Sequence, residues 1–288
     1  MAKVLAVLGR GAIDPEQPII RADDLGVLRG DGIFETLNVR GGEMFLLREH
    51  LVRMAASARR TEIDLPPYEA LDELSEQARQ AWLAHPDFDP DAEAALRIVA
   101  TRGLEHGSEP TVYATIDPVP RERTLPRRDG LQVLTASSGV NADTRGQAPW
   151  LLGGAKLLSY ATTMAVMRWA KSLGADDALW VTADGYCLEG PTSSLVWRDK
   201  DVLCTTPTDT GILPGTTSTY LLQHASKLGL RSEERLITPE KLTRVDGVWM
   251  TSSVRGVAFV TTLDGQELAT DPEMHSELVK LSGFELPS

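Results

Sequence analysis

The chain has 288 residues, of which 42% are apolar and 24% charged, a composition typical of a globular protein with an ample core. Its net charge of −12 argues against nucleic-acid binding, which needs a basic face, although local arginines could still bind an anionic small substrate. Cys187 and Cys204 give neither a disulfide framework nor the spacing of a metal site. No apolar run approaches a membrane span, so we expect a cytoplasmic protein.

In the first part of the chain, alternating apolar residues predict strands, and apolar residues three and four positions apart predict helices. The segment LRGDGIFETLNV turns at Gly30 and Gly32 and then alternates like a strand. The elements predicted here are an opening hairpin from Val4–Leu8, the strand within Leu28–Val39, helices over Leu47–Ala58 and Tyr68–Leu83, and strands over Ala95–Thr101 and Thr111–Ile116.

Residues 118–130 are rich in proline and charge and predict an interdomain linker. We therefore expect two α/β domains with mixed sheets, a smaller one over residues 1–117 and a larger one over 131–288. The larger domain is predicted to contain strands at Leu131–Thr135, Ala178–Thr182, Tyr186–Leu188, Val202–Thr205 and Gly247–Ser253, helices at Tyr160–Leu173 and from Gly215 to near Gly229, and a last helix.

Lys156 follows Gly153-Gly154-Ala155 and precedes two leucines, which is an apolar and flexible neighbourhood for a lysine. Burial lowers the pKa of a lysine and gives the neutral amine that attacks carbonyls. Glu189 ends the hairpin that turns at Asp184-Gly185. A buried lysine and a separate carboxylate suit pyridoxal phosphate (PLP), with the lysine on its aldehyde and the acid on its ring nitrogen. The ordinary alternatives are a loop lysine and a turn carboxylate.

Other segments offer anion-binding groups. Arg53 lies on a predicted helix, where its guanidinium could clamp a phosphate or simply face solvent. The stretch GILPGTT, which ends at Thr217, places a glycine turn and threonines at a helix N-terminus, which is either an anion site or an ordinary capped helix. Arg102 ends a strand and points either toward a substrate or into solvent.

Taken together, GDGIFET, HLxRMxxSA, GAKLLSYA, the hairpin ending in Glu-Gly, GILPGTT and WMTSS resemble the fold-type IV, or class IV, aminotransferase family. The resemblance runs from about Leu28 to Leu263, with the motifs in the family's order. That family includes branched-chain aminotransferases, D-amino-acid aminotransferases and 4-amino-4-deoxychorismate lyases. The resemblance implies the two-domain fold of D-amino-acid aminotransferases, a PLP cofactor between the domains, and a homodimer.

The resemblance also implies roles for single residues. Lys156 would form the Schiff base and carry protons, and Glu189 would contact the pyridine nitrogen. The remaining implied contacts are phosphate ligands at Arg53, Thr217 and Ser253, backbone donors at Gly215 and Thr216, and substrate-side residues at Thr36 and Arg102. One departure is Ser194, where many relatives have asparagine after the Glu-Gly pair.

Within the family, GAKLLSYATTMAV and YCLEGPTSS are most similar to actinobacterial members assigned as 4-amino-4-deoxychorismate lyases. We therefore expect a PLP-dependent lyase: the ring amine of the substrate displaces Lys156, the lysine removes the ring proton, and loss of the enolpyruvyl group gives pyruvate and 4-aminobenzoate for folate synthesis. Two alternatives stay open. One is an aminotransferase acting on D-amino or branched-chain amino acids, and the other is a PLP-binding protein without turnover.

Overall fold

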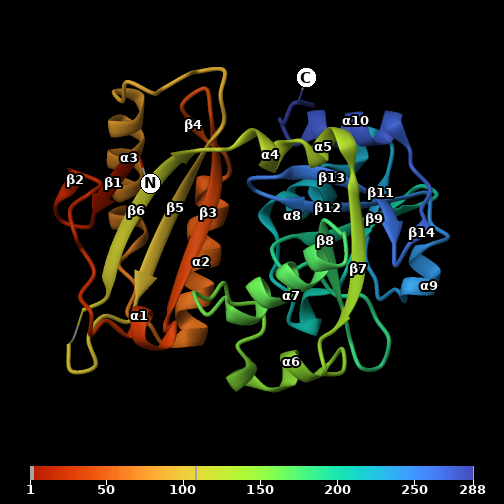
Figure 1. The fold of residues 1–288 in the computed structure, drawn as a ribbon, viewed down its shortest axis with the longest axis horizontal. Coiled ribbons are helices and arrows are strands. Elements are labelled where there is room, and N and C mark those ends of the chain that lie inside the picture. Colours follow the sequence, from red (N-terminus) through yellow and green to blue (C-terminus); the bar gives the residue numbers. More distant parts are fainter. Residues whose placement is uncertain (1–2, 108, 288) are drawn as a thin grey trace. The chain divides into compact units, whose positions relative to one another are not determined.

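The computed structural model describes residues 3–107 and 109–287, and its α/β fold with mixed sheets confirms the predicted class. The chain forms two compact units (Figure 1). Unit 1 comprises Met1–Pro120 and, from later in the chain, Ala155–Tyr160. Unit 2 comprises Arg121–Gly154 and Ala161–Ser288. The segment around Lys156 therefore packs with the N-terminal unit, although the residues on both sides of it belong to the other unit.

Unit 1 is built on an antiparallel sheet with strand order β2-β1-β6-β5-β3-β4. Helices α2 and α3 cover one face of this sheet (Figure 1). The elements are β1 (Val4–Val7), β2 (Gly11–Ile13), α1 (Leu25–Arg29), β3 (Gly32–Arg40), β4 (Glu43–Met44), α2 (Leu47–Thr61), α3 (Tyr68–Leu83), β5 (Ala94–Thr101) and β6 (Thr111–Pro118).

The alternation along β3 sorts its side chains between the two faces of this sheet. Ile33 and Leu37 point into the core with Leu51, Met54 and the apolar residues of α3. Phe34 and Thr36 therefore lie on the opposite face, the one that α2 and α3 do not cover.

Unit 2 is built on a mixed sheet with strand order β11-β10-β9-β12-β13-β7-β8, with β14 pairing to β13. Its strands are β7 (Leu131–Ser137), β8 (Asp177–Val181), β9 (Ser194–Asp199), β10 (Val202–Thr205), β11 (Arg231–Glu234), β12 (Gly247–Ser252), β13 (Gly256–Leu263) and β14 (Gln266–Glu267). Its helices are α4 (Arg121–Thr124), α5 (Pro126–Asp129), α6 (Thr144–Gln147), α7 (Ala161–Ser172), α8 (Thr216–Gln223), α9 (Pro239–Leu242) and α10 (Pro272–Leu281), with short 3₁₀ turns η1 (Pro149–Leu151), η2 (Thr208–Thr210) and η3 (Ala225–Leu228).

Alternate residues of β12 enter two cores of unit 2. Trp249 packs with Leu221 of α8 and Leu278 of α10, whereas Val248 and Met250 pack on the other side of the sheet. The sheet is therefore buried on both faces where β12 passes through it. None of the helices in the described residues has the length and apolar character needed to cross a membrane.

Several predicted boundaries shift in the structure. The predicted linker, residues 118–130, carries the short helices α4 and α5. The predicted return strand at Tyr186–Leu188 was wrong, because only Cys187 forms a bridge, to Val181. The predicted helix ending near Gly229 is interrupted: α8 ends at Gln223 and η3 continues to Leu228, before Gly229 adopts a φ of +71°.

Candidate functional site

The backbone of Lys156 is held on both sides. Its N–H donates to the hydroxyl of Ser57 on α2 at 3.0 Å, and its carbonyl accepts from the N–H of Phe34 at 3.1 Å. The next bond, from Leu158 N–H to the carbonyl of Gly32 at 2.8 Å, continues this pairing along β3. Residues 156–158 thus extend the open edge of β3, which β4 covers only at Val39 and Arg40. The segment that carries Lys156 is therefore fixed by hydrogen bonds of its backbone.

Glycines in GDG allow this close approach. A Cβ on Gly32 would lie 2.5 Å from Leu158 and 2.9 Å from the carbonyl oxygen of Ala100. Gly30 has a φ of +67°, and a Cβ there would lie 3.1 Å from Ser159. The two glycines of GDG are therefore needed for steric reasons, because any larger residue would push the segment around Lys156 away from β3.

The amine of Lys156 lies among aromatic groups. Its Nζ donates to the hydroxyl of Tyr160 at 3.3 Å and stands 4.5 Å from the ring centre of Phe34. The rings of Phe34 and Tyr160 contact each other, with centroids 5.2 Å apart. The sequence predicted a buried lysine, whereas the side chain is partly exposed, because the segment sits on a sheet edge. Tyr160 was not predicted as a site residue, and its signal in the sequence is its position four residues after Lys156.

Arg53 lies in a buried ion pair on the core side of α2. Its Nε and Nη2 donate to the carboxylate of Glu35 at 2.8 and 2.7 Å, and Glu35 is completely buried. His50 contacts the same carboxylate through Nδ1 at 2.7 Å. Because the carboxylate can only accept, this nitrogen carries the proton. The predicted phosphate role of Arg53 stays a prediction, and the structure adds that Glu35 binds one edge of its guanidinium through Nε and Nη2.

Burial and charge act in opposite directions on these groups. Burial alone would raise the pKa of Glu35, but the charge and hydrogen bonds of Arg53 and the hydrogen bond of His50 outweigh it and lower the pKa to about 2. Burial lowers the pKa of His50, so its ring stays neutral beside Arg53 and Lys156. The cluster therefore contains one carboxylate, one guanidinium and a neutral imidazole.

The two arginines near the uncovered face differ in their contacts. Arg102 donates to Asp31 at 2.6 Å and to the carbonyls of Thr61 and Glu62 at 2.6 and 2.9 Å. Arg97 pairs across the β3–β5 ladder with Thr36 and contacts its hydroxyl only at 3.5 Å. Its guanidinium carbon lies 5.9 Å from the ring centre of Phe34. The exposed Arg97, which was not predicted, is thus the arginine with donors to spare near Thr36, whereas Arg102 ties the end of α2 to Asp31.

In unit 2, Glu189 lies beside the loop that leads to α8. One carboxylate oxygen accepts from the N–H of Leu213 at 3.1 Å, and the other lies 3.8 Å from Nη1 of Arg145. The carbonyl of Glu189 also accepts from the N–H of Trp180 on β8 at 2.9 Å. Both the backbone and the carboxylate of Glu189 are therefore held in place by hydrogen bonds.

The N-terminus of α8 and the end of β12 form a second cluster, which we call the hydroxyl cup: Gly215, Thr216, Thr217 and Ser253. The hydroxyls of Thr216 and Ser253 are 3.3 Å apart. The hydroxyl of Thr217 is buried and has no hydrogen-bond partner among the described residues. A buried hydroxyl without a partner costs about 1–3 kcal/mol, and the backbone N–H groups at a helix N-terminus are able to bind an anion.

Ser194 explains part of the shape of the cup. A Cβ on Gly215 would collide with the hydroxyl of Ser194 and lie 2.7 Å from that of Ser218. Ser194 also pairs with Thr251 across the β9–β12 ladder. The small side chain of Ser194 therefore packs directly against the backbone of Gly215 in the cup.

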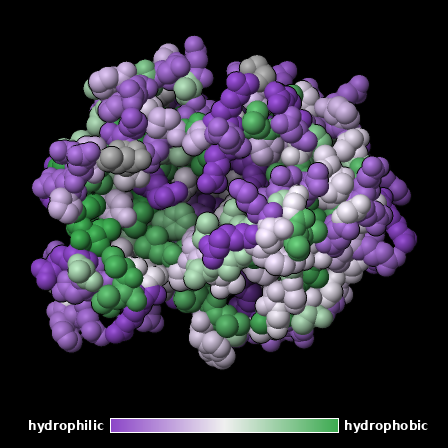
Figure 2. Space-filling model, viewed as in Figure 1, coloured by the Kyte–Doolittle hydropathy of each residue, from purple (hydrophilic) through white to green (hydrophobic). Residues whose placement is uncertain are grey.

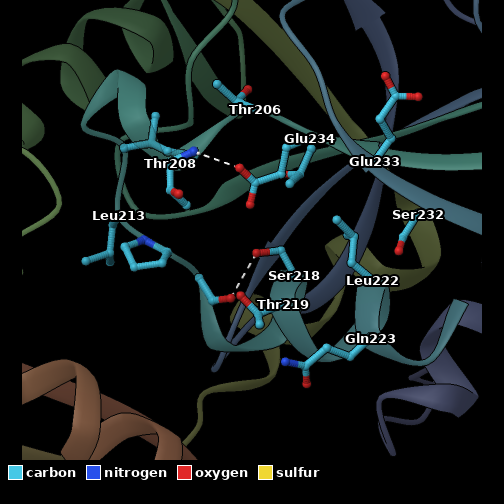
Figure 3. Close-up of a pocket in the computed structure, with 14 residues that line it drawn as sticks. Thr206, Thr208, Leu213, Ser218, Thr219, Leu222, Gln223, Ser232, Glu233 and Glu234 are labelled. Atoms are coloured by element: carbon cyan, nitrogen blue, oxygen red, sulfur yellow. Dashed lines mark hydrogen bonds between the residues drawn. The ribbon is translucent and has the colours of Figure 1, made fainter. Parts of the chain in front are cut away.

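A separate cleft of about 340 Å³ lies between α8 and β11 (Figure 3). Two of its polar side chains are paired: Ser218 donates to the carbonyl of Gly215 at 3.0 Å, and Glu234 accepts from the N–H of Thr208 at 3.1 Å. Glu233 and Glu234 give it negative charge, which opposes a phosphate. Of the hydroxyl cup, only Gly215 lines this cleft, so we do not assign it to the cofactor.

Comparisons with known proteins agree with this arrangement of motifs. The sequence profile of the family described as amino-transferase class IV matches residues 32–263. The chain belongs to this family.

Individual members of the family are similar over almost the whole chain. A bifunctional aminodeoxychorismate lyase / D-amino acid transaminase of Mycobacterium tuberculosis is 40% identical over 276 residues, which is 93% of this chain and 94% of that protein. A D-alanine aminotransferase of Bacillus licheniformis is 29% identical over 86% of this chain and 84% of that protein. The PLP-bound form of a hypothetical aminotransferase from Mycobacterium tuberculosis has a TM-score of 0.92 and 39% identity, covering 97% of this chain and 98% of that one.

The Glu35 cluster predicts how acid affects stability. The folded-state pKa of Glu35 lies below its ordinary value of 4.5, so its stabilisation is complete above pH 4.5 and disappears as the pH falls toward 2. Glu35→Gln should lower the free energy of unfolding at pH 7 by about 3 kcal/mol and flatten this acid dependence. Urea unfolding at several pH values measures both effects.

Asp31→Asn is the matched control, because it breaks the partly exposed ion pair with Arg102. We expect it to cost less than about 1 kcal/mol. A Glu35→Gln protein as stable as the wild type at pH 7 would contradict the importance of the buried cluster.

Proposed function

We propose that this protein is a PLP-dependent 4-amino-4-deoxychorismate lyase that releases pyruvate and supplies 4-aminobenzoate for folate synthesis. The observation that carries the proposal is the amine of Lys156, held on the edge of β3 against Tyr160 and Phe34. The similarity to the mycobacterial lyase / transaminase over 93% of the chain supports the choice of reaction. The residues at the site support it further, as the following paragraphs argue.

The residues present fit PLP. The hydroxyl cup offers backbone N–H groups at the start of α8 and the unpartnered hydroxyl of Thr217 for the phosphate, and Arg53 is proposed to add its positive charge. Glu189 supplies a fixed carboxylate for the ring nitrogen, and Lys156 the amine for the aldehyde. When bound, PLP withdraws electrons from the substrate carbon next to the amino group and so makes its proton acidic.

The chain's own residues would then control one proton. With PLP and substrate bound, the amine of Lys156 would remove the proton from the ring carbon that bears the substrate's amino group. The hydroxyl of Tyr160, at 3.3 Å, orients that amine, and the ring of Phe34 holds it on one side. The electrons of the broken C–H bond would make the ring aromatic as the C–O bond to the enolpyruvyl group breaks, and the released enolpyruvate would take up a proton on its methylene carbon to become pyruvate.

Substrate recognition needs cations on the same face as the amine. Arg97 and Thr36 lie next to each other there, and Arg97 approaches the ring of Phe34 that also contacts Lys156. We propose that Arg97 binds a carboxylate of the substrate, with Thr36 beside it. The contacts of Arg102 favour a structural contribution, because its donors already bind Asp31 and the end of α2.

Amino transfer is the second candidate, because the relatives include a protein named for both activities and a D-alanine aminotransferase. It would use the same lysine, which would return the proton to the cofactor carbon and leave the substrate skeleton intact. A noncatalytic PLP-binding protein would need neither proton transfer.

We also propose that the protein acts in the cytoplasm as a homodimer. Helix α7 leaves Met164 and Trp169 more than 40% exposed, and Trp150 is 79% exposed. Figure 2 shows apolar side chains exposed among polar ones on the face in view. Large exposed aromatic residues are typical of contact surfaces. Sedimentation of the purified protein at twice the 31.3 kDa chain mass would support the dimer, and sedimentation at that mass would contradict it.

Lys156→Ala tests the catalytic proposal. It should lower the rate of pyruvate release by at least roughly a thousandfold, because it removes both the covalent attachment and the base. The circular dichroism spectrum should stay unchanged. Lys171→Ala, in the last turn of α7, is the control and should keep wild-type activity. Retention of activity by Lys156→Ala would refute the proposed mechanism.

Arg97→Met tests substrate recognition. We expect KM to rise roughly tenfold, because the substrate loses one charge-assisted hydrogen bond, and we expect a smaller change in kcat. Arg102→Met is the comparison and should mainly lower the melting temperature. If KM rose only in the Arg102 variant, the two assignments would have to be exchanged.

A further inference from the structure

The buried side chain of Arg127 forms hydrogen bonds to the backbone of the turn that carries Ser253. The guanidinium of Arg127 donates from Nε to the carbonyl of Arg255 at 2.5 Å and from Nη2 to the carbonyl of Val254 at 2.9 Å. These are the two peptide carbonyls that directly follow Ser253. Arg127 is 1% exposed, so neither bond competes with water.

Arg127 comes from α5, within the segment that the sequence predicted to be a linker. Its Nη1 donates to the carbonyl of Glu285 at 3.3 Å, and its guanidinium lies 4.4 Å from the ring centre of Phe284. The ring of His275 on α10 donates from Nε2 to the carbonyl of Arg127 at 2.6 Å. In Figure 1, α5 and α10 lie side by side. These contacts hold Arg127 in place independently of its two hydrogen bonds to the turn.

Two further features fit the turn to this arginine. Gly256 has a φ of +77°, and a Cβ there would lie 2.8 Å from Nε of Arg127, so glycine is needed for the approach. The side chain of Arg255 extends to the fully buried Asp177 on β8, with Nη1 and the carboxylate 2.6 Å apart. The turn is therefore held by its carbonyls and by its one long side chain.

We infer that Arg127 is a positioning residue for phosphate binding: it fixes the turn so that the hydroxyl of Ser253 stays beside that of Thr216 in the hydroxyl cup. This rests on the proposed function, in which the cup holds the phosphate of PLP. Arg127 itself does not touch the cofactor. Its effect should therefore appear only with a ligand that carries the phosphate.

The test compares PLP with pyridoxal, which has the same ring and aldehyde but no phosphate. Titration calorimetry on the cofactor-free protein gives both dissociation constants, and their ratio isolates the contribution of the phosphate. Arg127→Met should reduce the preference for PLP roughly tenfold, because the phosphate loses its hydrogen bond from an aligned hydroxyl. The affinity for pyridoxal should stay within about twofold of the wild-type value. Arg127→Lys, which keeps the charge but loses the fork, should reduce the preference by a smaller factor and remains informative if the methionine variant does not fold.

Arg198→Met is the matched control. Arg198 on β9 forms a partly buried ion pair with Asp271 at 2.7 Å and touches neither the turn nor the cup. It should lower stability without changing the preference for PLP. Equal losses of PLP and pyridoxal affinity in the Arg127 variants, or an unchanged preference in Arg127→Lys, would overturn the inference alone. A wild-type protein without preference for PLP would overturn the proposed cup and the inference with it.

Discussion

The hydrogen bonds from the backbone of Lys156 to Ser57 and Phe34 are the constraint on which the site depends. They place the amine by its main chain, so its position follows from that of α2 and β3. Helix α2 is in turn tied to β3 by the buried pair of Arg53 and Glu35. The position of Lys156 in unit 1 therefore depends on a core ion pair between α2 and β3.

Unit 2 contains buried hydroxyl groups that have no hydrogen-bond partner among the described residues. Some of its buried hydroxyls bind nearby carbonyls, as Thr205 binds the carbonyl of Leu195 at 2.7 Å, whereas those of Ser193, Thr217 and Thr251 have no partner among the described residues. The hydroxyl of Thr217 is buried without a partner in the described part of the chain. An unsatisfied group at a helix N-terminus is a cost to folding that a bound anion removes. The negative charge of Glu233 and Glu234 in the cleft beside the hydroxyl cup, by contrast, opposes a phosphate there.

The sequence predicted the α/β class, the family and most strands and helices, because alternation and helical spacing are local signals. It also predicted Lys156, Glu189 and the start of α8 as chemical positions, since glycines and hydroxyls mark them directly. These residue roles stay predictions. The family and the fold are confirmed by the comparisons and the structure.

What the sequence could not provide depends on pairing between distant segments. The position of Arg97 beside Thr36 follows from strand register, and the contacts of Arg102 follow from where α2 ends. Arg127 lay in a stretch whose prolines and charges suggested a linker, and its burial depends on α10, more than a hundred residues later. The partial exposure of Lys156 likewise reflects an open sheet edge, which its apolar neighbours did not indicate.

The most direct test of the account is to give the purified, PLP-loaded protein 4-amino-4-deoxychorismate without any keto acid and to measure pyruvate and 4-aminobenzoate together. The account predicts that both products appear in equal amounts. If neither appears, and amino groups move instead from D-alanine or leucine to 2-oxoglutarate, the protein is an aminotransferase and the lyase proposal is wrong. If neither reaction occurs, the catalytic proposal itself is contradicted.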